Sequence, residues 1–419
     1  ILVLGVIGLV WTMLRRDDVV VLAWLTLLPL VGYFVLPKIG ITMLYNARLL
    51  PYWYFGMYVF AGIALGLAAV EIGRRFPLRR SVTIGLSLGA GFIVLVASIL
   101  SIHDVPGWVK WNFEGYEGKA DYAEYRTLME TVDTLPPGRI MWEANSEMNK
   151  YGTPMALMLF PYWSEGHPSM EGLFFESSLT TPFHFLNASE VSERPSNPVR
   201  GLDYRGFNME RGIAHLAVYN VAYYVSFTDA GADAARVAGL VEVGTAPPWH
   251  IFAMPPSDLV DIATIEPAVW AGGGDFLDPA LEWYDDVENL DHWLVEDGPQ
   301  EWERVETVEE RLLSVDAYDG SGVVSDVVAE DHRISFTTTA VGVPHLVKVS
   351  YFPNWTAEGA DGPYRAAPSL MVVVPTSEDV VLEFKNTNAE NTGMALTLTA
   401  AVGLGVYAYQ RRKHRVALD

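Results

Sequence analysis

The densest run of polar side chains lies between Trp142 and Gly152, in the segment WEANSEMNKYG. Aromatic rings stack on the apolar faces of sugars, and carboxylates and amides hydrogen-bond sugar hydroxyls. We therefore expect a carbohydrate-facing groove, and its candidate residues are Glu143, Asn145, Glu147, Glu171 and Glu176. Two carboxylates about 5 to 9 Å apart could also hydrolyse a glycosidic bond. The alternative is a satisfied structural network without a ligand.

A second candidate site lies in the segment PKIGITMLYNARLLP (37–51), which contains two bases and no acid. An arginine can bind a phosphate through two parallel hydrogen bonds. Arg48 also precedes the aromatic cluster Tyr52-Trp53-Tyr54, which is typical of a membrane interface. Arg48, with Lys38 and Asn46, is thus the candidate contact for a lipid-linked phosphate. The alternative is an anchor that touches lipid headgroups.

Other reactive patterns are weak. The chain has no cysteine, and its nine histidines lack zinc-binding spacing. Gly85-Leu-Ser-Leu-Gly89 matches a nucleophile motif but falls in a long apolar run, where helix packing is the better interpretation, as it is for Gly62-x-x-x-Gly66. We expect no metal and no cofactor, and the sequence identifies no catalytic residue.

Charge separates the chain into unlike parts. The net charge is −23, and residues 103–390 hold 47 acids against 16 bases. Both ends of the chain are apolar and mildly basic. A nucleic-acid partner is excluded because phosphate binding requires a basic face.

Four uncharged runs of 18 residues or more predict membrane spans, because about 20 apolar residues cross roughly 30 Å of hydrocarbon. These runs are residues 19–36, 52–70, 81–102 and 392–410, and residues 1–14 resemble the end of another helix. The expected fold class is therefore an α-helical transmembrane bundle, with four full spans plus a partial first helix. A large external region of α/β and antiparallel β-sandwich type completes it.

Three basic clusters predict the orientation of these spans, because bases near membrane helices favour the cytoplasm. They are Arg15-Arg16, Arg74 to Arg80, and the tail Arg411 to Arg415. With all three inside, residues 103–390 are extracytoplasmic and the C-terminus is cytoplasmic, in a multi-pass protein of the bacterial cell membrane.

The globular part divides into regions in which apolar residues recur with different spacing. Residues 103–258 contain a helical pattern over 121–135 and several strand patterns, typical of an α/β domain. Residues 259–300 suggest an acidic connecting segment. Residues 301–390 contain short β-branched runs, as expected of a β-sandwich domain. A helix at 391–410 and a basic tail at 411–419 complete the expected organisation.

The layout resembles large bacterial envelope proteins of the GT-C glycosyltransferase-like superfamily, in the 6-pyruvoyl-tetrahydropterin synthase-related membrane group. The resemblance rests on 46–54 (NARLLPYWY), 138–143 (GRIMWE), 150–154 (KYGTP), 169–172 (SMEG), 176–178 (ESS) and 349–355 (VSYFPNW). It implies a polyprenyl-phosphate-sugar donor and an envelope glycan as acceptor, beside membrane lipids. In that family the catalytic acid lies in an outer loop nearer the N-terminus.

We therefore expect the C-terminal part of a GT-C-like glycosyltransferase whose catalytic acid lies upstream of this segment. Whether the chain is an enzyme stays open. The alternative is a non-enzymatic, membrane-anchored envelope protein, either a glycan-binding scaffold or an assembly partner. An outer loop with paired acids favours the enzyme, and its absence favours the scaffold.

Overall fold

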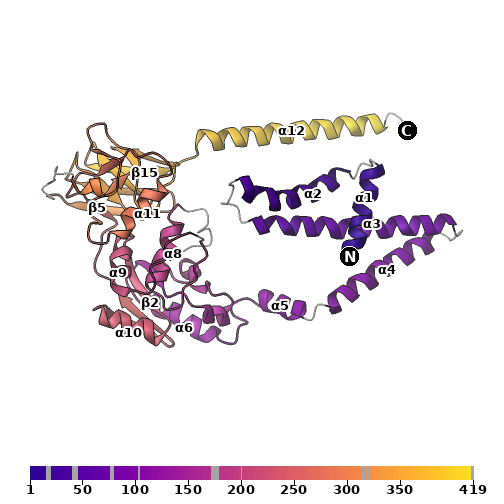
Figure 1. The fold of residues 1–419 in the computed structure, drawn as a ribbon, viewed down its shortest axis with the longest axis horizontal. Helices are drawn as coiled ribbons and strands as arrows, with labels where there is room; N and C mark the ends of the chain where they lie inside the picture. Colours follow the sequence, from indigo (N-terminus) through magenta and orange to yellow (C-terminus); the bar gives the residue numbers. More distant parts are fainter. Residues whose placement is uncertain are drawn as a thin grey trace. The chain divides into compact units, whose positions relative to one another are not determined.

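The computed structural model describes residues 1–15, 20–39, 46–75, 80–101, 104–170, 179–199, 201–313, 318 and 321–416. The chain forms two compact units, residues Ile1–Phe113 and Glu114–Asp419. The first unit is helical (Figure 1). Its elements are α1 (Leu2–Arg15), α2 (Val20–Val35), η1 (Leu36–Ile39), η2 (Asn46–Leu49), α3 (Leu50–Arg75), α4 (Arg80–Ser101) and α5 (Asp104–Phe113).

Small residues allow close helix contacts in the first unit. A Cβ at Gly8 would lie 2.0 Å from the Phe60 carbonyl oxygen, so α1 crosses α3 in near backbone contact (Figure 1). A Cβ at Gly56 would lie 2.1 Å from Thr26 Oγ1, so the Thr26 side chain of α2 packs directly on the α3 backbone. The prediction that helices pack on Gly62-x-x-x-Gly66 and on the glycines of 85–89 is wrong. Among the described residues, nothing lies within 4 Å of a Cβ built on these glycines.

The expectation of a bundle with four spans is also wrong. Within the described residues, two helical segments are long and apolar enough to cross a membrane, Val20–Ile39 and Asn46–Arg75. In α4 the apolar stretch Ile84–Leu100 has 17 residues, which cover only about 25 Å. The helix α12 (Asn388–Val416) is not among the candidate spans found in the described residues. Two helices that fit a span indicate membrane association.

The second unit is sheet-rich and begins with an α/β lobe built on a mixed sheet of order β1-β2-β4-β3. Strand β1 runs parallel to β2, and the other pairs are antiparallel. Alternate residues of β1 and β2 enter different cores, because Met141 and Tyr224 pack on one face while Ile140 and Tyr223 pack on the other. The strands are β1 (Arg139–Trp142), β2 (Val221–Ser226), β3 (Val241–Ala246) and β4 (Trp249–Ala253).

Helices pack around this mixed sheet. The helix expected over 121–135 is confirmed: α6 buries Tyr125, Leu128, Met129 and Val132 on one face. The helical elements of the lobe are α6 (Tyr122–Val132), η3 (Ser146–Tyr151), η4 (Ala156–Leu159), α7 (Phe160–Trp163), α8 (Thr181–Glu190), α9 (Met209–Val218) and α10 (Asp229–Val237).

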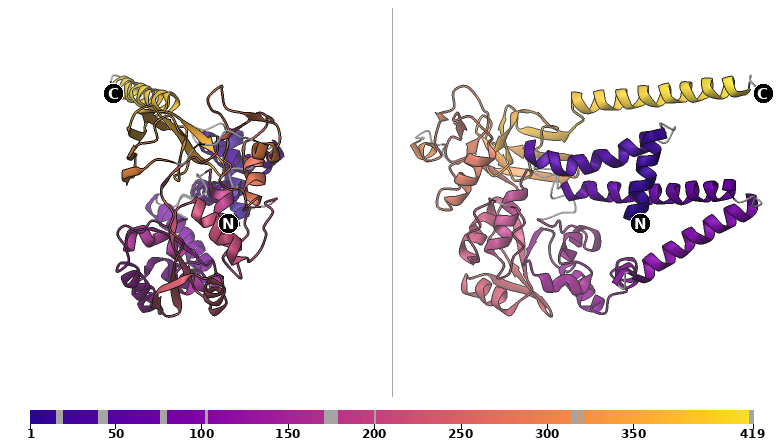
Figure 2. Two further views of the ribbon diagram at one scale, coloured as in Figure 1. Left: turned by 90° about the vertical axis from the view of Figure 1, so that its left-hand side faces the viewer. Right: turned by 45° about the vertical axis from the view of Figure 1, so that its right-hand side comes forward.

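Two further sheets form a β-rich lobe (Figure 2). One has the order β12-β15-β10-β9, and the other has the order β5-β11-β14-β13-β7-β6-β8. Side chains from both sheets, such as Phe336 and Val373, share one apolar core, so the sheets pack against each other. The strands are β5 (Val260–Ile262), β6 (Ala268–Trp270), β7 (Leu294–Val295), β8 (Arg304–Val305), β9 (Val324–Glu330), β10 (Arg333–Thr338), β11 (His345–Val347), β12 (Trp355–Glu358), β13 (Ala360–Ala366), β14 (Leu370–Pro375) and β15 (Asp379–Phe384).

Residues 259–300 are not a connecting segment. They supply β5, β6 and β7 to the larger sheet, together with helix α11 (Leu277–Asp285). Trp283 and Tyr284 of α11 join the core that the two lobes share. The short helix η6 (Glu309–Leu313) follows β8, and α12 follows β15.

Candidate functional site

A pocket of about 460 Å³ opens where β1 ends in the α/β lobe. Its volume falls within the roughly 300–1,000 Å³ of typical ligand pockets. Apolar side chains supply most of the wall, and polar groups are few. The apolar residues are Trp142, Ala144, Pro154, Met155, Phe185, Ala188 and Pro195, and the polar ones are Asn145, Ser146, Arg194 and Ser196. The predicted polar segment therefore does reach a pocket, through Asn145.

Asn145 is fixed by its role as the N-cap of η3. Its extended backbone starts the helix, and its Oδ1 accepts a hydrogen bond of 2.9 Å from the Glu147 backbone N–H. The Asn145 Nδ2 group makes no hydrogen bond to any described residue. The cap thus orients the amide and leaves two N–H bonds for a ligand.

Arg194 provides the cation of the pocket, from the segment after α8. Its Nη1 lies 3.7 Å from Glu147 Oε1, and both side chains are about two-thirds exposed. An exposed ion pair of this length contributes little to stability. The guanidinium of Arg194 therefore remains able to donate to a ligand, whereas Glu147 meets the pocket only through Arg194. The sequence did not single out Arg194, because an isolated Arg-Pro-Ser has no distinctive pattern.

Glu143 is fully buried and serves the turn after β2. Its carboxylate accepts hydrogen bonds from the backbone N–H groups of Phe227 (2.8 Å) and Thr228 (2.9 Å) and from Thr228 Oγ1 (2.7 Å). Burial raises the pKa of the Glu143 carboxyl, and the hydrogen bonds from Thr228 and Phe227 oppose that rise. Glu143 does not line the pocket, so this prediction identified a structural carboxylate.

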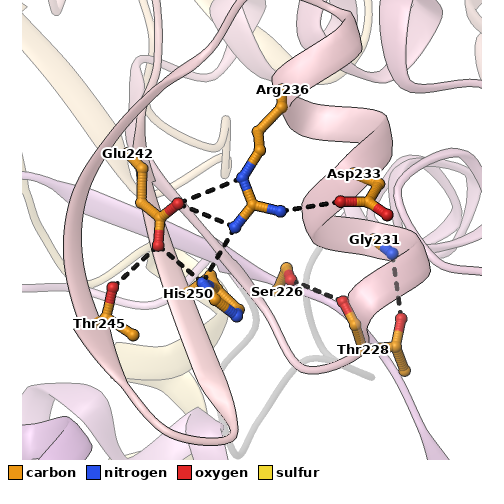
Figure 3. Close-up of polar contacts among 8 residues, drawn as sticks. All are labelled: Ser226, Thr228, Gly231, Asp233, Arg236, Glu242, Thr245 and His250. Atoms are coloured by element: carbon orange, nitrogen blue, oxygen red, sulfur yellow. Dashed lines mark hydrogen bonds and ion pairs between the residues drawn. The ribbon is translucent and has the colours of Figure 1, made fainter.

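The same turn begins α10, which carries a charged cluster (Figure 3). Thr228 Oγ1 caps α10 by accepting from the Gly231 N–H at 3.0 Å. Arg236 pairs with Asp233 at 2.8 Å and with Glu242 at 2.9 Å. Glu242 also contacts His250 Nδ1 at 2.6 Å, and its hydrogen bonds to His250 and Arg236 lower its pKa to about 2. These mutual pairs join α10 to β3 and β4 and indicate a structural role.

A buried acid–imidazole pair lies beneath α8. His215 Nδ1 is 2.7 Å from Glu190 Oε2, and His215 Nε2 is 2.7 Å from the Tyr284 carbonyl oxygen. The His215 ring also stacks on the Tyr284 ring at a centroid distance of 3.8 Å. Both ring nitrogens are occupied, so His215 connects α9 to α8 and α11 and has no free nitrogen for general-base catalysis.

A larger cleft, of about 910 Å³, runs between α9 and the strands β5, β9 and β11. Its buried Lys348 is neutralised by Asp261 at 2.8 Å and also donates to Ser257 Oγ at 2.7 Å. The aromatic side chain in its wall, Trp293, is buried. The cation and the ring of this cleft are thus both engaged within the protein, which makes it a weaker candidate for the predicted sugar chemistry.

The remaining candidates lie elsewhere. Glu171 and Glu176 fall outside the described residues. Lys38, Asn46 and Arg48 belong to the helical unit, where Asn46 Nδ2 donates to the Tyr33 carbonyl oxygen at 2.8 Å and the side chains of Lys38 and Arg48 are exposed. Asn46 thus closes the end of α2, and the two bases face outward on η1 and η2.

The described part of the chain holds no group of three or more potential metal ligands. Among the described residues, those that line the pocket include no carboxylate, so they support binding and offer no acid–base pair for hydrolysis. Comparisons with protein-family models, with curated proteins and with solved structures found no match.

Proposed function

We propose that the chain is a membrane-associated protein that binds a glycan through the pocket at the end of β1. The observation that carries the proposal is the combination of two hydrogen-bond donors, Asn145 Nδ2 and the Arg194 guanidinium, with an apolar wall. A pyranose ring presents C–H groups on its faces and hydroxyls at its edge. Met155 and Phe185 suit the faces, and the two donors suit the hydroxyl oxygens.

The resemblance to GT-C-like envelope proteins supports the same ligand class, and it adds a location. Envelope glycans lie outside the cytoplasmic membrane, so the proposal places the acidic region 103–390 there. The helices of Val20–Ile39 and Asn46–Arg75 provide membrane association.

The test is titration of the full chain, in lipid nanodiscs, with a panel of defined envelope oligosaccharides. Arg194→Ala should raise the Kd about tenfold or more, because a hydrogen bond from a charged group contributes roughly 1.5–3 kcal/mol. Arg333→Ala, on the exposed start of β10, is the matched control and should leave the Kd unchanged. If no oligosaccharide binds, or if both variants bind as the parent does, this function is wrong.

A second candidate function is transfer from a polyprenyl-phosphate-sugar donor, with Lys38 and Arg48 at the donor phosphate. The exposure of both cations on η1 and η2 favours it. Arg48→Ala in the full-length protein should then abolish binding and turnover of the lipid-phosphate sugar. Unchanged turnover and binding would remove Arg48 from this role.

A further inference from the structure

A separate groove of about 240 Å³ runs along α6 in the α/β lobe. One stripe of the helix lines it, at positions three or four residues apart, including Tyr122, Arg126 and Met129. Trp163 of α7 forms the opposite wall. Its volume lies below the roughly 300–1,000 Å³ of pockets for drug-sized ligands, which suits a single small ring.

The aromatic side of the groove is held in place. Tyr125 at its base is fully buried and donates to the Ala156 carbonyl oxygen at 2.9 Å. The Trp163 ring packs edge-on against the rings of Tyr125 and Tyr162, at centroid distances of 6.4 Å and 4.9 Å. Trp163 Nε1 has no hydrogen-bond partner among the described residues. A half-buried indole thus stands in the wall with its orientation fixed from two sides.

The opposite rim is polar and carries both signs of charge. Arg126 Nε donates to Glu130 Oε1 at 2.7 Å, and both side chains are nearly two-thirds exposed. Asp133 Oδ1 accepts from Ser164 Oγ at 2.7 Å, while Asp133 Oδ2 makes no hydrogen bond to a described residue. The three charged groups sum to −1. Carboxylate oxygens and guanidinium N–H groups beside an aromatic wall are suited to the vicinal hydroxyls of a sugar.

We infer that this groove binds one uncharged pyranose ring, which stacks on Trp163 and hydrogen-bonds Asp133, Glu130 and Arg126 through its hydroxyls. The net charge of the rim disfavours uronic acids, phosphates and nucleotides, whose anions would face two carboxylates. The inference extends glycan binding to a second place in the lobe. It rests on the α6 groove alone, so its test is independent of the pocket that contains Arg194.

The experiment is saturation-transfer NMR on the full chain in nanodiscs, with methyl glycosides of glucose, galactose, mannose and N-acetylglucosamine and with methyl glucuronide. At least one neutral glycoside should receive saturation at its ring C–H protons. Trp163→Ala should reduce its affinity at least tenfold, and Asp133→Asn about fivefold. Trp108→Ala, at an exposed tryptophan of α5, should leave that affinity unchanged.

Three results would overturn the inference: no saturation of any neutral glycoside, equal or tighter binding of the glucuronide, or full binding by Trp163→Ala. If Trp163→Ala fails to fold, Tyr122→Ala and Asp133→Asn test the same groove from α6. The two sites are tested separately. Loss of oligosaccharide binding in Arg194→Ala reports on the pocket at the end of β1, and loss of glycoside binding in Trp163→Ala reports on the α6 groove.

Discussion

Single residues in the α/β lobe show why chemical type alone did not identify the site. Glu143 and Asn145 are two positions apart, yet Glu143 points into the β2–α10 turn while Asn145 lines the pocket. Successive residues after a strand leave in different directions, and only the fold determines which of them meets a cavity. The predicted polar segment reaches the pocket, since Trp142, Asn145 and Ser146 line it. The prediction missed Arg194, which chain folding brings there from beyond α8.

At the residue scale, the Glu242 cluster of Figure 3 gives a pH-dependent prediction. The pKa of Glu242 falls from about 4.5 unfolded to about 2 folded, because His250 and Arg236 bind its carboxylate. Its contribution to stability is therefore present above the unfolded pKa and is lost as pH falls from about 4.5 towards 2. Glu242→Gln should reduce the unfolding free energy by about 1 kcal/mol at pH 7.

Thermal unfolding followed by near-ultraviolet circular dichroism measures this effect. The difference in Tm between the parent and Glu242→Gln should shrink as the pH approaches 2. Glu330→Gln, at an exposed position of β9, should show no such change. A difference in Tm that is constant from pH 7 to pH 2.5 would show that the cluster does not stabilise the fold through ionised Glu242.

At the scale of elements, local patterns were reliable for the short elements and unreliable for helix contacts. The strands β9, β10, β11, β14 and β15 all lie within residues 301–390, where β-branched runs predicted short strands. The helix contacts do not follow the glycine motif, because Gly5, Gly8 and Gly56 make the close approaches while Gly62 and Gly66 have open space. A small-residue motif permits contact on one face, and the partner helix decides which face is used.

This contrast is testable by exchanging glycine for leucine. Gly8→Leu should destabilise the α1–α3 contact by about 1–3 kcal/mol, because its side chain overlaps the Phe60 backbone and cannot be relieved by a rotamer change. Gly62→Leu is the matched control and should be neutral. The measurement is the thermal unfolding of the helical unit within the full chain in nanodiscs. Equal effects of the two substitutions would contradict the observed crossing.

At the scale of the whole molecule, composition predicted the separation of an apolar helical part from an acidic globular part. The two compact units divide the chain after Phe113, and the second unit also includes the C-terminal helix α12. The number of spans could not be read in the same way. An uncharged run sets only the maximum length of an apolar helix. Helix α4 has 22 residues, and the apolar stretch Ile84–Leu100 within it has 17. Residues 259–300 were misassigned because β5, β6 and β7 are only two or three residues long.

The proposed location outside the membrane also belongs to this scale. The chain lacks cysteine, so Ser377→Cys introduces a single thiol. In intact cells a membrane-impermeant maleimide should label position 377 without permeabilisation. If labelling of Ser377→Cys required permeabilisation, the globular unit would lie in the cytoplasm and could not meet an envelope glycan.

The central claim, that a glycan occupies the pocket at the end of β1, is tested most directly by ligand protection. Ser196→Cys places a reactive thiol on the exposed rim beside Arg194, and Ser377→Cys places one on the exposed turn before β15. With a saturating oligosaccharide that binds the parent chain, the rate of maleimide labelling at position 196 should fall at least fivefold, and the rate at position 377 should not change. An unchanged rate at position 196 with the oligosaccharide bound would place the glycan elsewhere and contradict the claim.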